Sequence, residues 1–212
     1  KHKDDSEELR RIVRLFPKKA EAERVNQSEL DKIPAKEYTY QAKVLYQKYN
    51  NQNKIKSSDF PIEPNLKLKL GALVMMVKND SGKHWVNGTL GIISSLSDDS
   101  IKVMINEIEY EVQKQVFESR EANLVGGHIE YDVILKVEQY PVVLGYALTI
   151  HKSQGQTYKK VACDITDCFA PGQAYVALSR CSTLDGLHLI KEIDRRHIEV
   201  NSEVKQFYLS SR

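Results

Sequence analysis

The segment 145–191 limits most strongly how this chain can fold. Two polar motifs, TIHKSQGQT at residues 149–157 and GQAYVALSRCSTLDG at residues 172–186, lie on either side of a short apolar run at 161–165. A second apolar run follows at residues 187–190. The order of strand, helix and strand predicts a β-α-β unit in a parallel sheet.

The first motif has polar side chains in a pattern that suits an amphipathic helix. Residues 145–154 contain no proline and few β-branched residues, and Gly155 follows where a helix would stop. At helical spacing, Thr149, Lys152 and Ser153 share a face. Their hydroxyl and ammonium groups are donors suited to phosphate oxygens. A solvated helix face without a ligand fits the same pattern.

The second motif predicts a helix that begins after Pro171 and Gly172. Gln173, Val176 and Arg180 recur at i, i+3 and i+7, so they share one face. This spacing places the Arg180 guanidinium near the helix end, where it can reach a neighbouring group. A surface arginine that caps the helix end is the alternative.

Both motifs resemble conserved segments of superfamily 1 DNA helicases of the RecD/Pif type. T-x-H-K-S-Q-G-x-T resembles their motif V, and Y-V-A-L-S-R with a glycine after five further residues resembles their motif VI. Residues 68–79 and 86–91 resemble two further segments of that family, and residues 14–26 resemble its motif IV. The resemblance implies that the chain is the C-terminal, second RecA-like domain of such a helicase.

The resemblance also implies an α/β fold. We expect a RecA-like parallel sheet with helices on both faces, into which a small antiparallel β-barrel similar to a Src-homology-3 domain is inserted. The motor domain would comprise residues 1–78 and 141–212, and the barrel residues 79–140. Short alternating strands between residues 85 and 137 independently favour a small antiparallel barrel.

The other elements follow from local turn and periodicity signals. We expect a strand at residues 11–16, a helix at 18–33, a second helical piece at 41–49, a loop at 50–59, and a mild helical pattern at 193–212. Residues 66–77 fit either a strand pair or one long strand, broken at Gly71.

Composition restricts the class of protein. The net charge of +2 shows that this is not a highly basic nucleic-acid protein. Residues 98–133 carry nine acidic and three basic side chains. If the resemblance holds, this stretch faces away from DNA, because phosphates would be repelled there. An ordinary solvated surface is the alternative.

Location and assembly are expectations from absent signals. No apolar run reaches the roughly 20 residues of a membrane span, and no signal peptide is visible. The three cysteines form no C-x-x-C pair, which suits reduced thiols. We therefore expect a monomer without a membrane partner, in the cytoplasm (with the nucleoid in a bacterium) or in a eukaryotic nucleus.

The resemblance implies a role for each residue that matches a family motif. Arg180 corresponds to the catalytic arginine finger of motif VI, which reaches the γ-phosphate of ATP. The residues expected near ATP are Gln154, Gly155, Gln173 and Arg14. The residues expected to contact single-stranded DNA are Thr149, His151, Lys152, Asn79 and Lys18. No metal ligand is expected.

For several of these residues, an ordinary structural role is the alternative. A lone histidine such as His151 is more often a packed or surface residue. Asn79 lies in a turn-forming context, as do Asn87 and Gly88. Trp85 either stacks on a base or packs inside the barrel.

Two parts of a complete helicase are missing from the sequence. It contains no G-x-x-x-x-G-K-[ST] phosphate loop and no Asp-Glu pair at the end of an apolar strand to hold Mg²⁺. In the family both belong to the first RecA-like domain, which would precede residue 1. We therefore expect ATP and Mg²⁺ to be bound mainly by that N-terminal domain of the same protein, and the chain alone to be inactive.

Three functions remain open from the sequence. The first is the C-terminal motor portion of an ATP-dependent helicase that translocates on single-stranded DNA. The second is a non-catalytic nucleic-acid-binding module, and the third is an interaction subunit of a recombination complex. A phosphate loop encoded upstream of residue 1 would favour the first.

Overall fold

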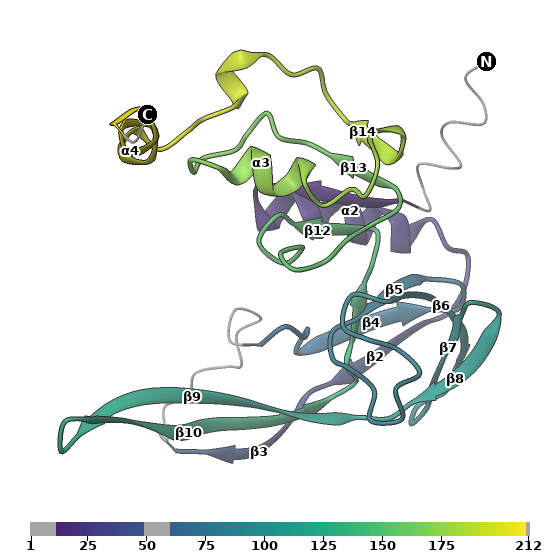
Figure 1. The fold of residues 1–212 in the computed structure, drawn as a ribbon. Coiled ribbons are helices and arrows are strands. Elements are labelled where there is room, and N and C mark those ends of the chain that lie inside the picture. The colour runs from purple at the N-terminus through teal and green to yellow at the C-terminus, as the bar shows by residue number, and fades with distance from the viewer. Residues whose placement is uncertain (1–11, 49–59, 211–212) are drawn as a thin grey trace, which may run out of the picture. The chain divides into compact units, whose positions relative to one another are not determined.

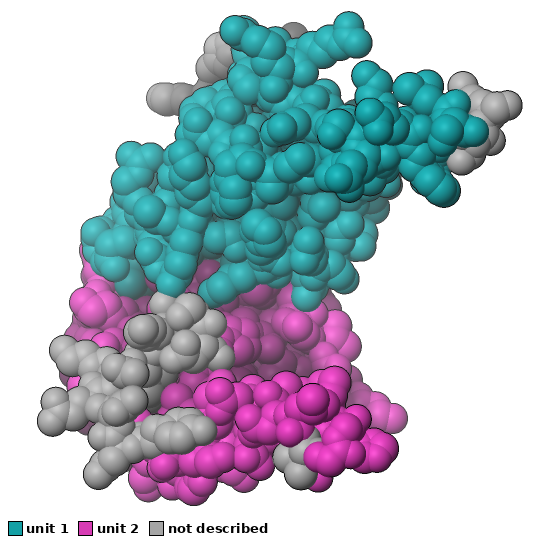
Figure 2. All heavy atoms as spheres, turned by 90° about the vertical axis from the view of Figure 1, so that its left-hand side faces the viewer, with its two compact units in different colours: residues 1–32, 145–212 teal, residues 33–144 magenta. Residues whose placement is uncertain are grey.

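The computed structural model describes residues 12–48 and 60–210 (Figure 1). The chain divides into two compact units (Figure 2). Unit 1 comprises residues 1–32 and 145–212, and unit 2 comprises residues 33–144. Residues 33–78 and 141–144, which we expected in the motor domain, therefore belong to unit 2. The physical reason is strand pairing, because β5 (Leu73–Met76) pairs with later strands of that unit.

Unit 1 is built on a four-stranded sheet with the order β12-β1-β13-β14. Its strands are all parallel: β1 (Val13–Phe16), β12 (Ala147–Thr149), β13 (Val161–Cys163) and β14 (Leu187–Leu189). The helix α3 (Gln173–Leu178) lies between β13 and β14 in the chain, so the predicted β-α-β unit is confirmed.

Helices cover both faces of this sheet. Phe16 packs with Ala22 of α2 (Lys19–Asp31), which places α2 on the face to which Phe16 points. Leu15 points to the opposite face, and its register partner is Cys163. The Cys163 thiol lies 3.7 Å from the backbone carbonyl of Ala177, to which it donates, so α3 covers that opposite face. Figure 1 shows α2 and α3 beside the strands.

The helix that we expected at residues 145–154 is absent; the segment forms β12 followed by a turn at residues 150–155. Its backbone bonds go to β1, since Arg14 N donates to Tyr146 O at 3.0 Å and Ile150 N donates to Phe16 O at 2.9 Å. Ala147 and Leu148 are both buried. A strand that is covered on both faces is apolar on successive residues, and this run imitates part of a helical pattern.

Unit 2 consists of antiparallel strands in three sheets. The sheet orders are β11-β5-β6-β7-β8, β3-β10-β9 and β2-β4. The remaining strands are β2 (Glu37–Gln41), β3 (Lys43–Gln47), β4 (Asn65–Lys69), β6 (Leu90–Leu96), β7 (Ile101–Ile105), β8 (Ile108–Val112), β9 (Gln115–Val125), β10 (His128–Gln139) and β11 (Val142–Leu144). Figure 1 shows β9 and β10 as a long ribbon.

Local predictions in unit 2 had mixed outcomes. The strand pair at residues 66–77 is confirmed as β4 and β5, with Gly71 between them at a φ of +84°. The helical piece expected at residues 41–49 is wrong, because Gln41 ends β2 and residues 43–47 form β3, which pairs with β10. The loop expected at residues 50–59 lies outside the described residues.

The C-terminal segment carries two short elements beyond the parallel sheet. They are a 3-10 turn at Arg195–His197 and the helix α4 (Ser202–Ser210), which agrees with the helical pattern of the tail. A further 3-10 turn, Leu184–Gly186, precedes β14. Across residues 12–48 and 60–210, every helix is too short or too polar to cross a membrane.

Candidate functional site

The candidate site lies at the carboxyl edge of the parallel sheet in unit 1. β1 is followed by α2 on one face, and β13 is followed by α3 on the other, which makes this edge a topological switch point. Lys18 follows β1, and His151 and Lys152 follow β12. The fold thus brings these three predicted residues to the same edge, where open α/β sheets bind ligands.

The turn at residues 150–155 is held by its own hydrogen bonds. Lys152 N donates to Thr149 Oγ1 at 3.1 Å, and the buried Ser153 hydroxyl donates to Ile150 O at 2.7 Å. Gly155 has a φ of +77°, a left-handed conformation that glycine adopts without strain. The side chains of His151, Lys152 and Gln154 are consequently exposed on a fixed backbone.

His151 has an aromatic neighbour that we did not predict. Its ring and that of Phe169 are stacked, with centroids 6.4 Å apart. Phe169 lies in the loop before α3 and is exposed.

The guanidinium of Arg180 is fixed by neutral acceptors. Nε donates to Val176 O at 3.0 Å, Nη1 to Gln156 O at 3.1 Å, and Nη2 to Ser179 Oγ at 3.0 Å. Across the part of the chain that the structure describes, no carboxylate is paired with it. Arg180 is partly exposed, and none of its three acceptors carries a negative charge.

Backbone bonds join the two motifs. Tyr158 N donates to Arg180 O at 2.8 Å, and Ser182 N donates to Tyr158 O at 3.0 Å. Gly186 allows the segments to approach, because a Cβ at that position would lie 1.9 Å from Lys159 O. The position of Arg180 therefore depends directly on the segment that follows the turn.

The side chain of Gln173 is buried. Its Oε1 accepts a 3.0 Å hydrogen bond from Phe169 N, so it fixes the loop before α3. Its Nε2 is buried without a partner among the described residues. The hydrogen bond of this side chain goes to Phe169 and not to Arg180.

Arg14 is occupied by an ion pair with α2. Both its Nη1 and its Nη2 donate to Glu29 Oε1 at 3.1 Å, and Lys32 Nζ donates to the same oxygen at 3.0 Å. Burial alone would raise the pKa of Glu29, but the hydrogen bonds from Lys32 and Arg14 hold it below its usual range. In this structure the Arg14 guanidinium is therefore engaged by a carboxylate of α2.

Lys18 and Asn79 have weak and local contacts. Lys18 Nζ lies 3.8 Å from Asp167 Oδ2, and both side chains are about half exposed. Asn79 lies in unit 2, where its Oδ1 accepts a 2.8 Å bond from Asn87 N, as a turn former does. Trp85 is buried and packs against His84 and Tyr110, so its packing alternative holds.

Sequence reasoning missed an ion pair at the same edge, in which the carboxylate is buried and the lysine is half exposed. Asp164 directly follows β13, accepts a 2.7 Å bond from the Thr166 hydroxyl and lies 2.8 Å from Lys191 Nζ. Burial raises the pKa of Asp164, but the bonds from Lys191 and Thr166 outweigh it and lower the pKa overall. An aspartate after a buried parallel strand was the available signal.

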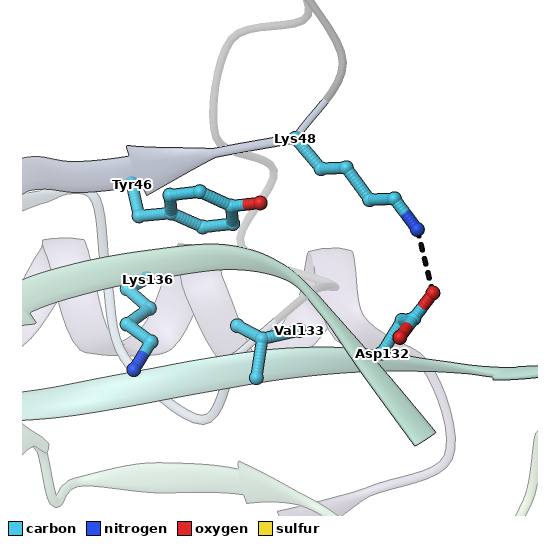
Figure 3. Close-up of a pocket in the computed structure, with 5 residues that line it drawn as sticks. All are labelled: Tyr46, Lys48, Asp132, Val133 and Lys136. Carbon is cyan, nitrogen blue, oxygen red and sulfur yellow. Dashed lines mark hydrogen bonds and ion pairs between the residues drawn. The ribbon is translucent and has the colours of Figure 1, made fainter. Parts of the chain in front are cut away.

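A hollow in unit 2 has a volume of about 460 Å³ (Figure 3). Its lining residues are Tyr46, Lys48, Asp132, Val133 and Lys136. Lys48 is paired with Asp132 at 2.6 Å, and Lys136 with Glu118 at 2.7 Å. Because both cations are neutralised, this hollow is a poorer anion site than the edge of unit 1. Among the described residues, no three His, Cys, Asp or Glu side chains are grouped to hold a metal ion.

Comparisons with known proteins agree with the motifs. Residues 51–96 match the family described as the 2B domain of DNA helicase Pif1. Over 208 residues, the chain is 38% identical to the ATP-dependent DNA helicase Pif1 of Bdellovibrio bacteriovorus; the match covers 98% of this chain and 45% of that protein. The chain belongs to the Pif1 helicase family.

Solved Pif1 structures share the fold. Unliganded Pif1 from Bacteroides sp. superposes with a TM-score of 0.80 at 30% identity, covering 99% of this chain and 47% of that one. The Bacteroides Pif1 complex with ADP-AlF3 and ssDNA superposes with a TM-score of 0.68 at 31% identity, covering 94% and 44%. The chain thus spans less than half the length of these Pif1 proteins.

Proposed function

We propose that this chain is the C-terminal motor portion of an ATP-dependent DNA helicase that translocates on single-stranded DNA and unwinds duplex. In this proposal unit 1 is the second RecA-like motor domain, and the antiparallel strands of unit 2 form the inserted barrel similar to a Src-homology-3 domain. The match of residues 51–96 to the Pif1 2B domain supports the second assignment.

The observation that carries the proposal is the state of Arg180. A group that stabilises phosphoryl transfer must bring uncompensated positive charge to the triphosphate. Arg180 is bound by two carbonyls and a hydroxyl, which orient a guanidinium without neutralising it. An arginine finger is worth roughly 10³–10⁵ in rate, or about 4–7 kcal/mol.

We place the DNA backbone at the turn after β12. Lys152 and His151 are exposed there, and the hydrogen bonds of Thr149 and Ser153 hold the turn in shape. Such groups position a phosphate backbone without reading its sequence. A Pif1 relative with the same fold was solved with ADP-AlF3 and ssDNA, which supports both ligands.

ATP and Mg²⁺ would be held mainly by a first RecA-like domain of the same protein. The sequence of this chain has no phosphate loop to cradle a triphosphate. Its own contribution to hydrolysis is Arg180, with Gln154 and Gly155 beside the nucleotide. The chain by itself should therefore show no ATPase activity.

The test is Arg180→Ala in the longer protein that contains this chain. We expect DNA-stimulated ATP hydrolysis to fall by roughly 10³-fold or more, with the dissociation constant for single-stranded DNA nearly unchanged. Arg180→Lys should not restore the rate, because an ammonium lacks the planar fork of the guanidinium. Arg196→Ala is the matched control, since Arg196 is exposed and its one ion pair among the described residues is with Asp194.

Each outcome has a defined meaning. Retained ATPase activity in a folded Arg180→Ala protein would exclude the finger role. An intact longer protein that binds DNA without hydrolysing ATP would favour the non-catalytic binding module instead.

A further inference from the structure

The helix α4 is well formed, but none of its side chains is buried against the described part of the chain. All its residues are exposed, and none of Ser202–Ser210 is buried. Asn201 caps its first turn, because its Oδ1 accepts bonds from Glu203 N at 2.8 Å and Val204 N at 3.2 Å. A helix shorter than about 12 residues is marginal in water on its own, so α4 needs a surface to pack against.

One face of α4 is apolar. Val204, Phe207 and Tyr208 recur at i, i+3 and i+4, the spacing of a single helical stripe. We call these three residues the tail stripe. Phe207 and Tyr208 are 66% and 68% exposed. Gln206 lies on the opposite face, which is polar except for Leu209.

The tail stripe is too small to form a dimer interface with a second copy of the chain. A stable dimer needs about 20–30 residues on each side. Three side chains on one short helix are far fewer. A surface within the same protein needs less area, because the tether raises its effective concentration.

The Pif1 relatives contain a large region outside the match, which could provide such a surface. The match to the Bdellovibrio protein covers 98% of this chain but 45% of that protein, so more than half of the relative lies outside the match. The Bacteroides structure gives the same picture, with 99% and 47%.

We propose that the tail stripe docks into an apolar groove of the first motor domain of the same protein and so ties the two motor halves together. The mode is an amphipathic helix in a groove, anchored by Phe207 and Tyr208. This inference rests on the proposed function, because it requires the companion domain.

The test is photo-crosslinking in the longer protein. Phe207 is replaced by the photoreactive residue p-benzoylphenylalanine, and crosslinked peptides are mapped by mass spectrometry. We expect crosslinks into the segment that precedes residue 1, and we expect at least tenfold fewer from the same residue placed at Gln206. Crosslinks to residues 115–139, crosslinks to a second copy, or no crosslinks would each overturn the proposal.

A second measurement covers variants that perturb the helix itself. Hydrogen exchange of α4 should be at least tenfold slower in the intact protein than in a Phe207→Ser, Tyr208→Ser double variant. Exchange of α4 at the rate of an unstructured peptide in both proteins would contradict docking. ATPase activity is measured in parallel: activity without crosslinks defeats the docking alone, and crosslinks without activity defeat the helicase proposal alone.

Discussion

The Arg180 guanidinium donates from Nη1 to the backbone carbonyl of Gln156 at a distance of 3.1 Å. Its other two bonds stay within its own segment, at Val176 and Ser179. This bond therefore joins the guanidinium of the second motif to the backbone of the first. A conformational change in the turn before Gln156 should therefore shift the Arg180 guanidinium.

Gly155→Ala tests this coupling. Gly155 has a φ of +77° and no atom of this chain within 4 Å of its missing Cβ, so within the chain the substitution acts through backbone conformation. The left-handed conformation costs a non-glycine residue roughly 1–2 kcal/mol, and relaxing it would shift Gln156. We expect a lower kcat for ATP hydrolysis in the longer protein. Gly155→Asn should recover part of the lost kcat, since asparagine tolerates this conformation better. An unchanged kcat for the alanine variant would contradict the coupling between the turn and Arg180.

Lys152→Ala should weaken DNA binding in a salt-dependent manner. Lys152 is exposed on the ordered turn, where one ammonium can displace one counterion from a phosphate. We expect the slope of log K against log salt to become less steep by about 0.7 for single-stranded DNA. The measurement is fluorescence anisotropy at several salt concentrations. Lys205→Ala on α4 is the control, and equal slopes for all three proteins would contradict the assignment.

The Asp164–Lys191 pair should make stability depend on pH at the acid end. The pKa of Asp164 is lowered from 3.8 in the folded state, so its contribution is present above pH 3.8 and is lost as the pH falls through the lowered value. Asp164→Asn should reduce the free energy of unfolding at pH 7 by about 1–2 kcal/mol.

Denaturant unfolding at several pH values checks this sign. The difference between the parent protein and Asp164→Asn should shrink as the pH falls below 3.8. Because the pKa of Lys191 is raised from 10.5, the difference should also decline at high pH, above 10.5. A difference that grows toward acid would show that the pair does not stabilise the fold.

Gln139→Ala should destabilise unit 2. The fully buried side chain donates to Tyr40 O at 2.9 Å and Glu63 O at 3.2 Å, and it accepts from Tyr140 N at 2.9 Å. Removing it leaves three backbone groups without these partners, which should cost about 3 kcal/mol. Gln113→Ala is the exposed control, with an expected change within about 0.5 kcal/mol. A chemical denaturation midpoint equal to that of the control would refute the role.

The parallel sheet around α3 could be predicted because each signal was local. Gly172 begins the helix at a φ of +78°, and the apolar runs beside it became β13 and β14. The strand β12 could not be predicted, because burial on both faces removes the alternation of apolar and polar residues that marks a strand. Residues 43–47 became a strand only through pairing with β10.

The candidate site was partly visible from the sequence. Arg180, His151 and Lys152 could be predicted as site residues because each lies within a contiguous sequence motif. The acceptors of Arg180 and the partner of Asp164 depend on the fold; Gln156 lies 24 residues from Arg180, and Lys191 lies beyond α3. Arg14 matched a family segment, yet a carboxylate on the next helix holds it.

The most direct test of the central claim compares a transition-state analogue with a ground-state ligand. In the longer protein with single-stranded DNA, Arg180→Ala should weaken binding of ADP–aluminium fluoride by about 100-fold or more. Binding of a non-hydrolysable ATP analogue should change by less than about threefold, because the finger acts mainly on charge that develops during transfer. Equal losses for the two ligands, or no loss for either, would contradict the role of Arg180.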